Sequence, residues 1–140
     1  MTLRRAMRPM PTCRRGAAAV EFVLVGPLLL LLLFNLIVYS GWFWIAHGVQ
    51  SLASEGARAA LAGLDAAERE TLARDLIATE AADLGLDPRR ATVQVASDAE
   101  GVRVRIAYDA ASHPMMALAG LTYAPPMEIR RTATVRLGGY

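Results

Sequence analysis

Glu21 is the residue whose position in this sequence most directly suggests a chemical role. It stands at the start of a long uncharged apolar run, where a buried carboxylate without a partner costs up to a few kcal/mol and so favours a nearby cation. A cut after Gly16 would supply that cation, because it would create an α-amine at Ala17, one helical turn before Glu21. With a reference pKa of about 8, the amine could pair with Glu21 of its own chain or of a neighbour. Without the cut, a carboxylate solvated at the inner headgroup level is the simpler interpretation.

Residues that commonly carry catalysis or bind metals are few and far apart in the sequence. Cys13, the single cysteine, precedes the apolar run, whereas His47 and His113 follow it. This separation argues against a nucleophile triad, a disulfide and a histidine-rich metal site. The sequence also has no glycine-rich phosphate loop and no metal-loop pattern of acids. We therefore expect no catalytic residue, no metal ion and no cofactor, and we expect that the protein is not an enzyme.

Basic charge is concentrated in a short amino-terminal segment. All 15 basic residues are arginines, and five of them precede Gly16 without an acidic residue among them. After Gly16, ten arginines stand against thirteen acids, a net charge of −3. This distribution argues against a nucleic-acid-binding surface, so no nucleic-acid partner is expected.

Residues 22–46 form a candidate membrane span. Hydrophobic residues make up 54% of the 140-residue chain, and these 25 positions contain no charged side chain. As a helix they would extend roughly 37 Å, which exceeds the hydrocarbon thickness of about 30 Å. Because arginines precede the span and are missing just after it, the amino terminus should be cytoplasmic. We therefore expect a basic cytoplasmic leader at residues 1–16, a transmembrane helix at 17–47 and an exported domain at 48–140.

Several residues of this span carry specific expectations. Pro27 removes a helix hydrogen bond and should kink or loosen the helix. Asn35 lies near mid-bilayer, where an amide prefers a partner on another helix, although a lone asparagine is also tolerated. The aromatic residues Tyr39, Trp42 and Trp44 are expected to mark the outer membrane interface.

The remainder of the sequence predicts an α+β fold. Small and apolar residues recur at helical spacing up to Gly63, so the membrane helix should continue or restart as an exported helix with one face of mostly small residues. Asp65 and Glu68 form a capping box for a second helix, which Gly85 and Pro88 end. The charged residues between 68 and 75 are expected to form a solvated outer face of that helix.

After residue 88 the apolar period changes to two, which predicts a small antiparallel sheet. Residues 92–96 and 102–108 form a hairpin around a turn at 98–101, and a third strand lies near 127–137. Arg131 interrupts the alternation of the third strand, so a bulge is allowed there. Residues 109–126 are expected to be a loop. If the second and third strands pair, four arginines would form a basic stripe on one face of the sheet, either as an ordinary polar face or as a dock for an acidic partner: Arg103, Arg105, Arg130 and Arg136.

The segment around Glu21 resembles the processing site of type IV pilins and pseudopilins, which has glycine before the cut and glutamate at the fifth mature position. More closely, RRGAAAVEFVLVGPLLLLLL is similar to the opening of the TadE-like family, minor pilin-like proteins of the tight adherence (Tad) pilus machinery. Gly16, Val20, Glu21, Phe22 and Pro27 carry the similarity, together with the leucine run. SEGARAA at residues 54–60 adds a second similarity, and the resemblance covers residues 14–62.

This resemblance implies a fold, a location and partners. It implies a pilin-like protein of the bacterial inner membrane, with a periplasmic carboxy-terminal domain, that takes part in Tad pilus assembly, secretion and adherence. A prepilin peptidase would cut between Gly16 and Ala17, Glu21 and Phe22 would dock on other subunits, and Pro27 would kink the helix. Tad minor pilins and the major pilin would be partners, and the protein could itself be pilus-associated.

Two alternatives to this function stay open. The first is an unprocessed single-span membrane adaptor that presents a periplasmic binding domain. The second, which the sequence supports less, is an enzyme anchored by the same helix. The mass of the mature amino terminus separates a processed pilin-like protein from the adaptor.

Overall fold

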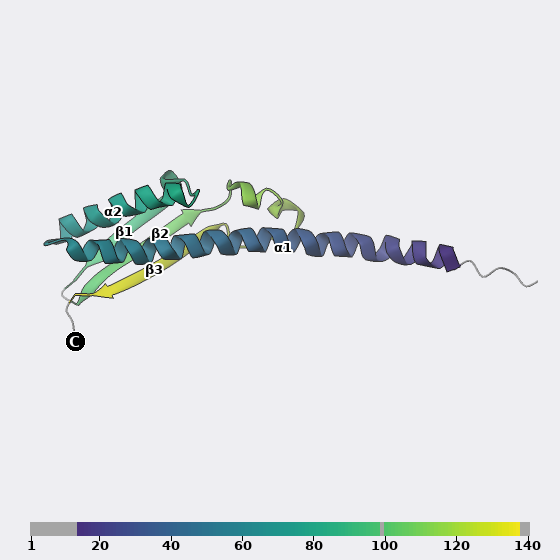
Figure 1. Cartoon of the computed structure of the whole chain (residues 1–140), viewed down its shortest axis with the longest axis horizontal. Coiled ribbons are helices and arrows are strands. Elements are labelled where there is room, and N and C mark those ends of the chain that lie inside the picture. The colour runs from purple at the N-terminus through teal and green to yellow at the C-terminus, as the bar shows by residue number, and fades with distance from the viewer. Residues whose placement is uncertain (1–13, 99, 138–140) are drawn as a thin grey trace, which may run out of the picture.

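One helix of 46 residues, α1 (Arg14–Ala59), runs along the length of the molecule (Figure 1). The computed structural model describes residues 14–98 and 100–137, so Cys13 and most of the predicted leader lie outside the described residues. At about 1.5 Å per residue, α1 is roughly 69 Å long, more than twice the thickness of a bilayer's hydrocarbon core. The helix continues through residue 47 without a break, so the segments predicted as a membrane helix and as an exported helix form one element.

The elements that follow α1 fold back along its carboxy-terminal half (Figure 1). In chain order they are η1 (Ala60–Ala62), α2 (Ala66–Asp83), η2 (Pro88–Arg90), β1 (Ala91–Ser97), β2 (Gly101–Asp109), η3 (Pro114–Met116), η4 (Ala119–Leu121) and β3 (Glu128–Arg136). The strands form an antiparallel sheet in the order β1-β2-β3. The predicted α+β fold, with a long amino-terminal helix, a second helix and a small antiparallel sheet, is confirmed.

The start and end of α2 follow from local sequence. The Asp65 carboxylate accepts a hydrogen bond from the Glu68 backbone N–H at 2.8 Å, and the Glu68 carboxylate accepts one from the Leu64 N–H at 2.7 Å. The return bond thus reaches one residue further upstream than in the usual capping box. At the other end, Gly85 has a φ of +69°, the left-handed conformation that glycine adopts readily after a helix.

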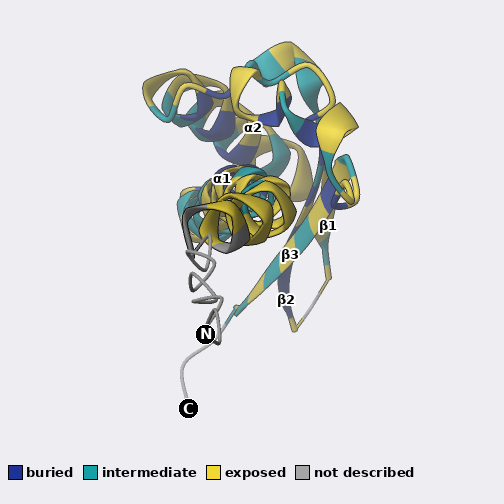
Figure 2. Cartoon of the chain, turned by 90° about the vertical axis from the view of Figure 1, so that its right-hand side faces the viewer, coloured by how far each residue is buried: buried dark blue, intermediate teal, exposed yellow. Residues whose placement is uncertain are grey.

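The core lies between the carboxy-terminal half of α1, α2 and one face of the sheet (Figure 2). Every second residue of β2 is buried there, as the predicted period of two requires: Val102, Val104, Ile106 and Tyr108. The same core contains the buried α1 residues Val49, Leu52 and Ala53. No helix covers the opposite face of the sheet within the described residues, and its side chains are exposed.

Helices α1 and α2 approach each other closely at Gly56. A Cβ atom at this position would lie 2.7 Å from Ile77 Cδ1 and 3.0 Å from Ile77 Cγ1. Ile77 is only 2% exposed, so its side chain has little room to move away. The predicted small-residue face of α1 therefore packs against α2 of the same chain.

Arg131 does not introduce the bulge that the sequence allowed. Strands β2 and β3 pair without interruption along their whole length, and Arg131 lies opposite Ile106 on the inner face. Its guanidinium lies 5.9 Å from the centroid of the Trp42 ring, a cation–π contact. This contact gives the Arg131 guanidinium a partner at the edge of the core. The charged side chain can therefore face inward while the strand keeps its regular register.

The expectation of a fully solvated charged face on α2 is wrong at Arg69. This residue is half-buried. Its Nε donates to the Gly63 carbonyl at 3.0 Å, and a terminal guanidinium nitrogen donates to Ser97 Oγ at 2.9 Å. Arg69 therefore ties the turn before α2 to the end of β1, a connection between distant segments that the local charge pattern does not reveal.

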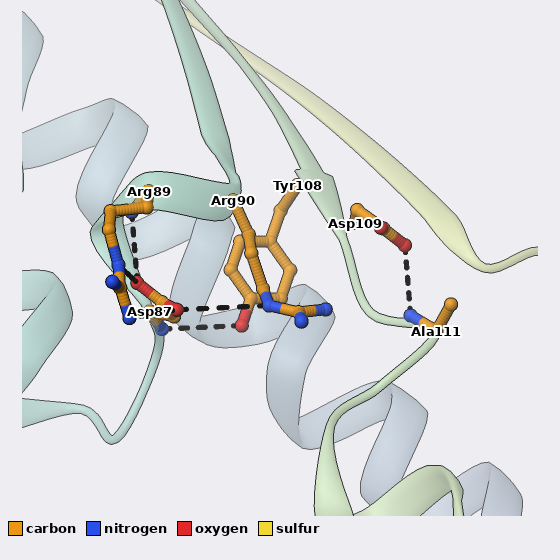
Figure 3. A network of polar contacts seen from close by, with 6 residues as sticks. All are labelled: Asp87, Arg89, Arg90, Tyr108, Asp109 and Ala111. Carbon is orange, nitrogen blue, oxygen red and sulfur yellow. Dashed lines mark hydrogen bonds and ion pairs between the residues drawn. The ribbon is translucent and has the colours of Figure 1, made fainter.

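A polar cluster around Asp87 closes the connection from α2 to β1 (Figure 3). The Asp87 backbone N–H donates to the hydroxyl of the buried Tyr108 at 3.4 Å. The Asp87 carboxylate accepts from Arg89 Nε at 3.1 Å and lies 3.8 Å from Arg90 Nε. The side-chain hydrogen bond from Arg89 lowers the pKa of the Asp87 carboxyl, and the same bond raises the pKa of the Arg89 guanidinium.

Candidate membrane and assembly surface

The amino-terminal half of α1 is a surface, apolar except for Glu21 and Asn35, that the rest of the described chain leaves uncovered. Residues 18–37 are exposed apart from three of intermediate exposure, and Val38 is the first residue with 0% exposure. These 20 positions correspond to about 30 Å of helix, which matches the hydrocarbon thickness of a bilayer. By length and composition, α1 is the one helix among the described residues that could cross a membrane. We call residues 18–37 the free half of α1.

The remaining domain begins to cover α1 inside the predicted span of residues 17–47. A Cβ atom at Gly41 would lie 2.8 Å from Met115 Cβ, so the loop after β2 packs directly on the helix. Nearby, Trp42 Nε1 donates a hydrogen bond to the Pro126 carbonyl at 2.8 Å. Trp42, predicted as a membrane-interface residue, is half-buried and fastens this loop to α1. Trp44 remains 49% exposed.

The predicted processing site lies at the start of α1. Gly16 and Ala17 both belong to the first described residues of the helix, and a Cβ atom at Gly16 would meet no described atom within 4 Å apart from the backbone of its own helix. The spacing of four residues places Ala17 and Glu21 on the same side of the helix, one turn apart. The site is therefore open, and an amine formed at Ala17 would be within reach of the Glu21 carboxylate.

Glu21 and Phe22 are both exposed, so both side chains are available to a partner. Glu21 is exposed, and Phe22 is 76% exposed. A carboxylate and an aromatic ring thus stand next to each other at the base of the free half of α1. The structure brings the four predicted residues of processing and docking together within two turns at one end of the molecule.

Pro27 and Asn35 both alter hydrogen bonding within the free half. The α-helix continues through Pro27, but proline has no N–H, so the carbonyl of Val23 lacks its usual donor four residues later. Asn35 Nδ2 donates to the Leu31 carbonyl at 2.9 Å. That bond gives the Asn35 amide a partner within its own helix. The sequence alone favours a partner on another helix, with a lone tolerated asparagine as the alternative.

The two histidines and the acidic residues do not gather into a chemical centre. His47 is exposed on α1, and His113 Nδ1 accepts a hydrogen bond from the Met115 N–H at 3.3 Å, which caps η3. Within residues 14–98 and 100–137, no group of three or more His, Cys, Asp or Glu side chains is placed to hold a metal ion.

The four arginines of the predicted basic stripe do share the exposed face of the sheet. Arg103 and Arg105 come from β2, and Arg130 and Arg136 from β3. A hydrogen-bonded ion pair at 2.8 Å joins Arg130 to Glu128, and it raises the pKa of the Arg130 guanidinium. The stripe is therefore partly neutralised by the sheet itself.

The loop between β2 and β3 is the functional candidate that sequence reasoning treated only as a connection. Residues 110–127 contain no Asp, Glu, Lys or Arg, although they form a long segment between strands. The lack of charge can be seen in the sequence. Its possible role depends on the position of the loop against α1, which only the fold shows.

Comparison with known proteins supports the predicted resemblance. A family model described as TadE-like protein matches residues 16–58. The matched segment begins at the predicted cleavage site, contains the whole free half of α1 and ends just after Gly56. No curated protein and no solved structure matches the chain.

Proposed function

From the match of residues 16–58 to the TadE-like family model, we propose that this chain is a pilin-like subunit of a bacterial Tad pilus system. The main support for the proposal is the free half of α1. It is long enough to cross a bilayer, contains Glu21 near its start and ends where the domain begins. An apolar surface of this size needs a membrane or other subunits to cover it. The arginine asymmetry places the amino terminus in the cytoplasm and the domain in the periplasm.

Processing is the first step of this proposal. A prepilin peptidase cuts between Gly16 and Ala17 and removes the five leader arginines. The scissile bond lies in the first turn of α1, so this turn has to unwind to enter a protease site.

Docking on other subunits is the second step. The new Ala17 amine and the Glu21 carboxylate pair within one chain or between neighbours, and Phe22 adds apolar contact area. In a low-dielectric setting such a pair is worth a few kcal/mol if the neighbour shares the desolvation, and much less if water reaches it. The partners in this proposal are Tad minor pilins and the major pilin, and the outcome is pilus assembly, secretion and adherence.

The intact mass of the protein purified from cells with and without the peptidase tests the proposal. We expect a mature chain that begins at Ala17 only when the peptidase is present. Gly16→Leu should block the cut, and because the space around Gly16 is open, this variant should still fold. Gly26→Ala is the matched control, since its Cβ would meet only the Phe22 ring at 3.8 Å, and it should be cut normally.

A wild-type chain that still begins at Met1 or Thr2 in the presence of the peptidase would contradict the processing step. The protein would then be an unprocessed membrane adaptor, because the free half of α1 would still anchor the domain. Normal cutting of Gly16→Leu would place the site elsewhere.

A further inference from the structure

The loop at residues 110–127 has a composition suited to a membrane surface. It has no Asp, Glu, Lys or Arg, and it connects Asp109 to Glu128, which face each other at the end of the β2–β3 ladder. Three apolar or aromatic side chains of the loop are exposed: Met115 at 41%, Leu121 at 61% and Tyr123 at 83%. Exposed apolar side chains gathered in one segment indicate a contact with a membrane or a partner.

The position of the loop is the second observation. Its turns η3 and η4 form the end of the domain nearest to the free half of α1 (Figure 1). The loop contacts Gly41 and Trp42, three and four residues after Val38, where the covered part of α1 begins. That distance is about 5–6 Å along the helix. The headgroup layer beyond a hydrocarbon core of about 30 Å is of similar depth, because the whole bilayer measures about 40–45 Å.

The loop's backbone also suits this environment. Buried or interfacial N–H groups need acceptors, and the two turns provide several: the N–H groups of Met116, Ala117 and Leu121 donate to carbonyls three residues earlier. Three prolines of the segment have no N–H to satisfy: Pro114, Pro125 and Pro126. These groups keep their partners, or need none, when the loop leaves bulk water for the headgroup layer.

We propose that the loop at residues 110–127 lies in the headgroup region of the outer leaflet, with Leu121 and Tyr123 directed to the lipid. Tyr123 is suited to this depth because its ring is apolar and its hydroxyl remains hydrated. On the helix, the exposed Phe43 and Trp44 extend the apolar surface, and the Trp44 ring lies 6.4 Å from the ring of His113. The loop thereby fixes the depth of the domain on the membrane. This inference rests on the proposed anchoring by α1.

Lipid, and not a second copy of the chain, is the occupant that the arrangement favours. The loop continues the apolar surface of the free half of α1, and whatever surrounds the outer end of that helix also surrounds the loop. A membrane-anchored monomer would already bring the loop to the bilayer surface without any association.

Spin labels on the full chain in phosphatidylcholine–phosphatidylglycerol vesicles test the proposal. In a Cys13→Ser background, labels are placed at Leu121→Cys and at Tyr123→Cys, both at exposed positions. Leu29→Cys in the free half and Ala78→Cys on the exposed face of α2 are the references. Collision rates with oxygen, which partitions into lipid, and with a water-soluble nickel chelate are measured by power saturation.

We expect labels at 121 and 123 to collide with the nickel chelate several-fold less than the label at 78, at all protein-to-lipid ratios. Accessibility at 121 and 123 equal to that at 78, with the label at 29 in lipid, would overturn the inference and leave the anchoring intact. Protection that arises only at high protein density would assign the loop to a second copy and also overturn it. A water-accessible label at 29 would refute both the anchoring and the inference.

Discussion

Gly56→Ala tests whether the small-residue face of α1 packs within the chain. In an open helix position this change stabilises a protein by about 1 kcal/mol, because alanine has the higher helix propensity. At Gly56 the added Cβ would lie 2.7 Å from Ile77 Cδ1, so Ile77 or α2 must shift. Overpacking of this kind costs about 1–3 kcal/mol. We expect a net loss in the free energy of unfolding of up to about 2 kcal/mol.

Gly48→Ala is the matched control on the same helix. Its Cβ would lie 3.5 Å from Leu86 Cδ1, an ordinary contact, so we expect a gain of about 1 kcal/mol. In an Ile77→Ala background the conflict at Gly56 disappears, and Gly56→Ala should then become stabilising. The double-mutant cycle should therefore show an interaction energy of about 1–3 kcal/mol between positions 56 and 77.

Urea unfolding of the full chain in detergent micelles, followed by near-ultraviolet circular dichroism, measures these differences. The signal reports the loss of the Trp42 contacts with Pro126 and Arg131. Equal stabilisation by Gly56→Ala and Gly48→Ala would refute the packing argument. A stable Gly56→Ala domain that no longer associates with other subunits would assign the small-residue face to assembly.

Two further predictions concern local polar contacts. Asp65→Ala removes the cap of α2 and should lower the free energy of unfolding by about 1 kcal/mol in the same urea assay. Asp87 has a lowered pKa in the folded chain, so the stability it contributes is present above its unfolded pKa of about 3.9 and is lost as the pH falls through the folded pKa. As the pH falls below about 4, the melting temperature of Asp87→Asn should consequently decrease less steeply than that of wild type. An equal decrease in both proteins would contradict a stabilising role of the ionised Asp87 carboxylate.

The elements that sequence patterns predicted well are those specified by neighbouring residues. The Asp65 cap, the Gly85 stop and the alternation in β2 act over a few positions, so they can be read without the fold. Trp42 and Pro126 are 84 positions apart, and a helical tryptophan gives no indication of which carbonyl will accept its N–H. The environment of Arg131 could not be predicted for the same reason, because the Trp42 ring that its guanidinium contacts belongs to a distant segment of the chain.

For the candidate site, too, only the features specified by neighbouring residues could be predicted from the sequence. Gly16, Ala17 and Glu21 form a local pattern, so the sequence alone was enough to single them out. Where the domain first covers α1 could not be read from charge or periodicity, because residues 38–46 continue the uncharged run while also packing against the domain. The interfacial loop likewise depends on how the end of the β2–β3 ladder is placed against Gly41.

The central claim is that the free half of α1 joins other subunits through Glu21, and crosslinking tests it most directly. A photocrosslinking residue at Leu29, which is 60% exposed, reports neighbours of the helix in membranes of pilus-producing cells. Wild type is compared with Glu21→Ala and Glu21→Gln at equal membrane levels. Both variants should insert normally, since the apolar length is unchanged and a carboxylate only weakens partition into lipid.

Both variants should lose the crosslinks to other Tad subunits, because the pair with an Ala17 amine is missing. Every 1.4 kcal/mol removed weakens association about tenfold, so even a modest pair gives a measurable loss. Unchanged crosslinks and normal pilus assembly in both variants would contradict the claim and make Glu21 a solvated residue at the inner headgroup level.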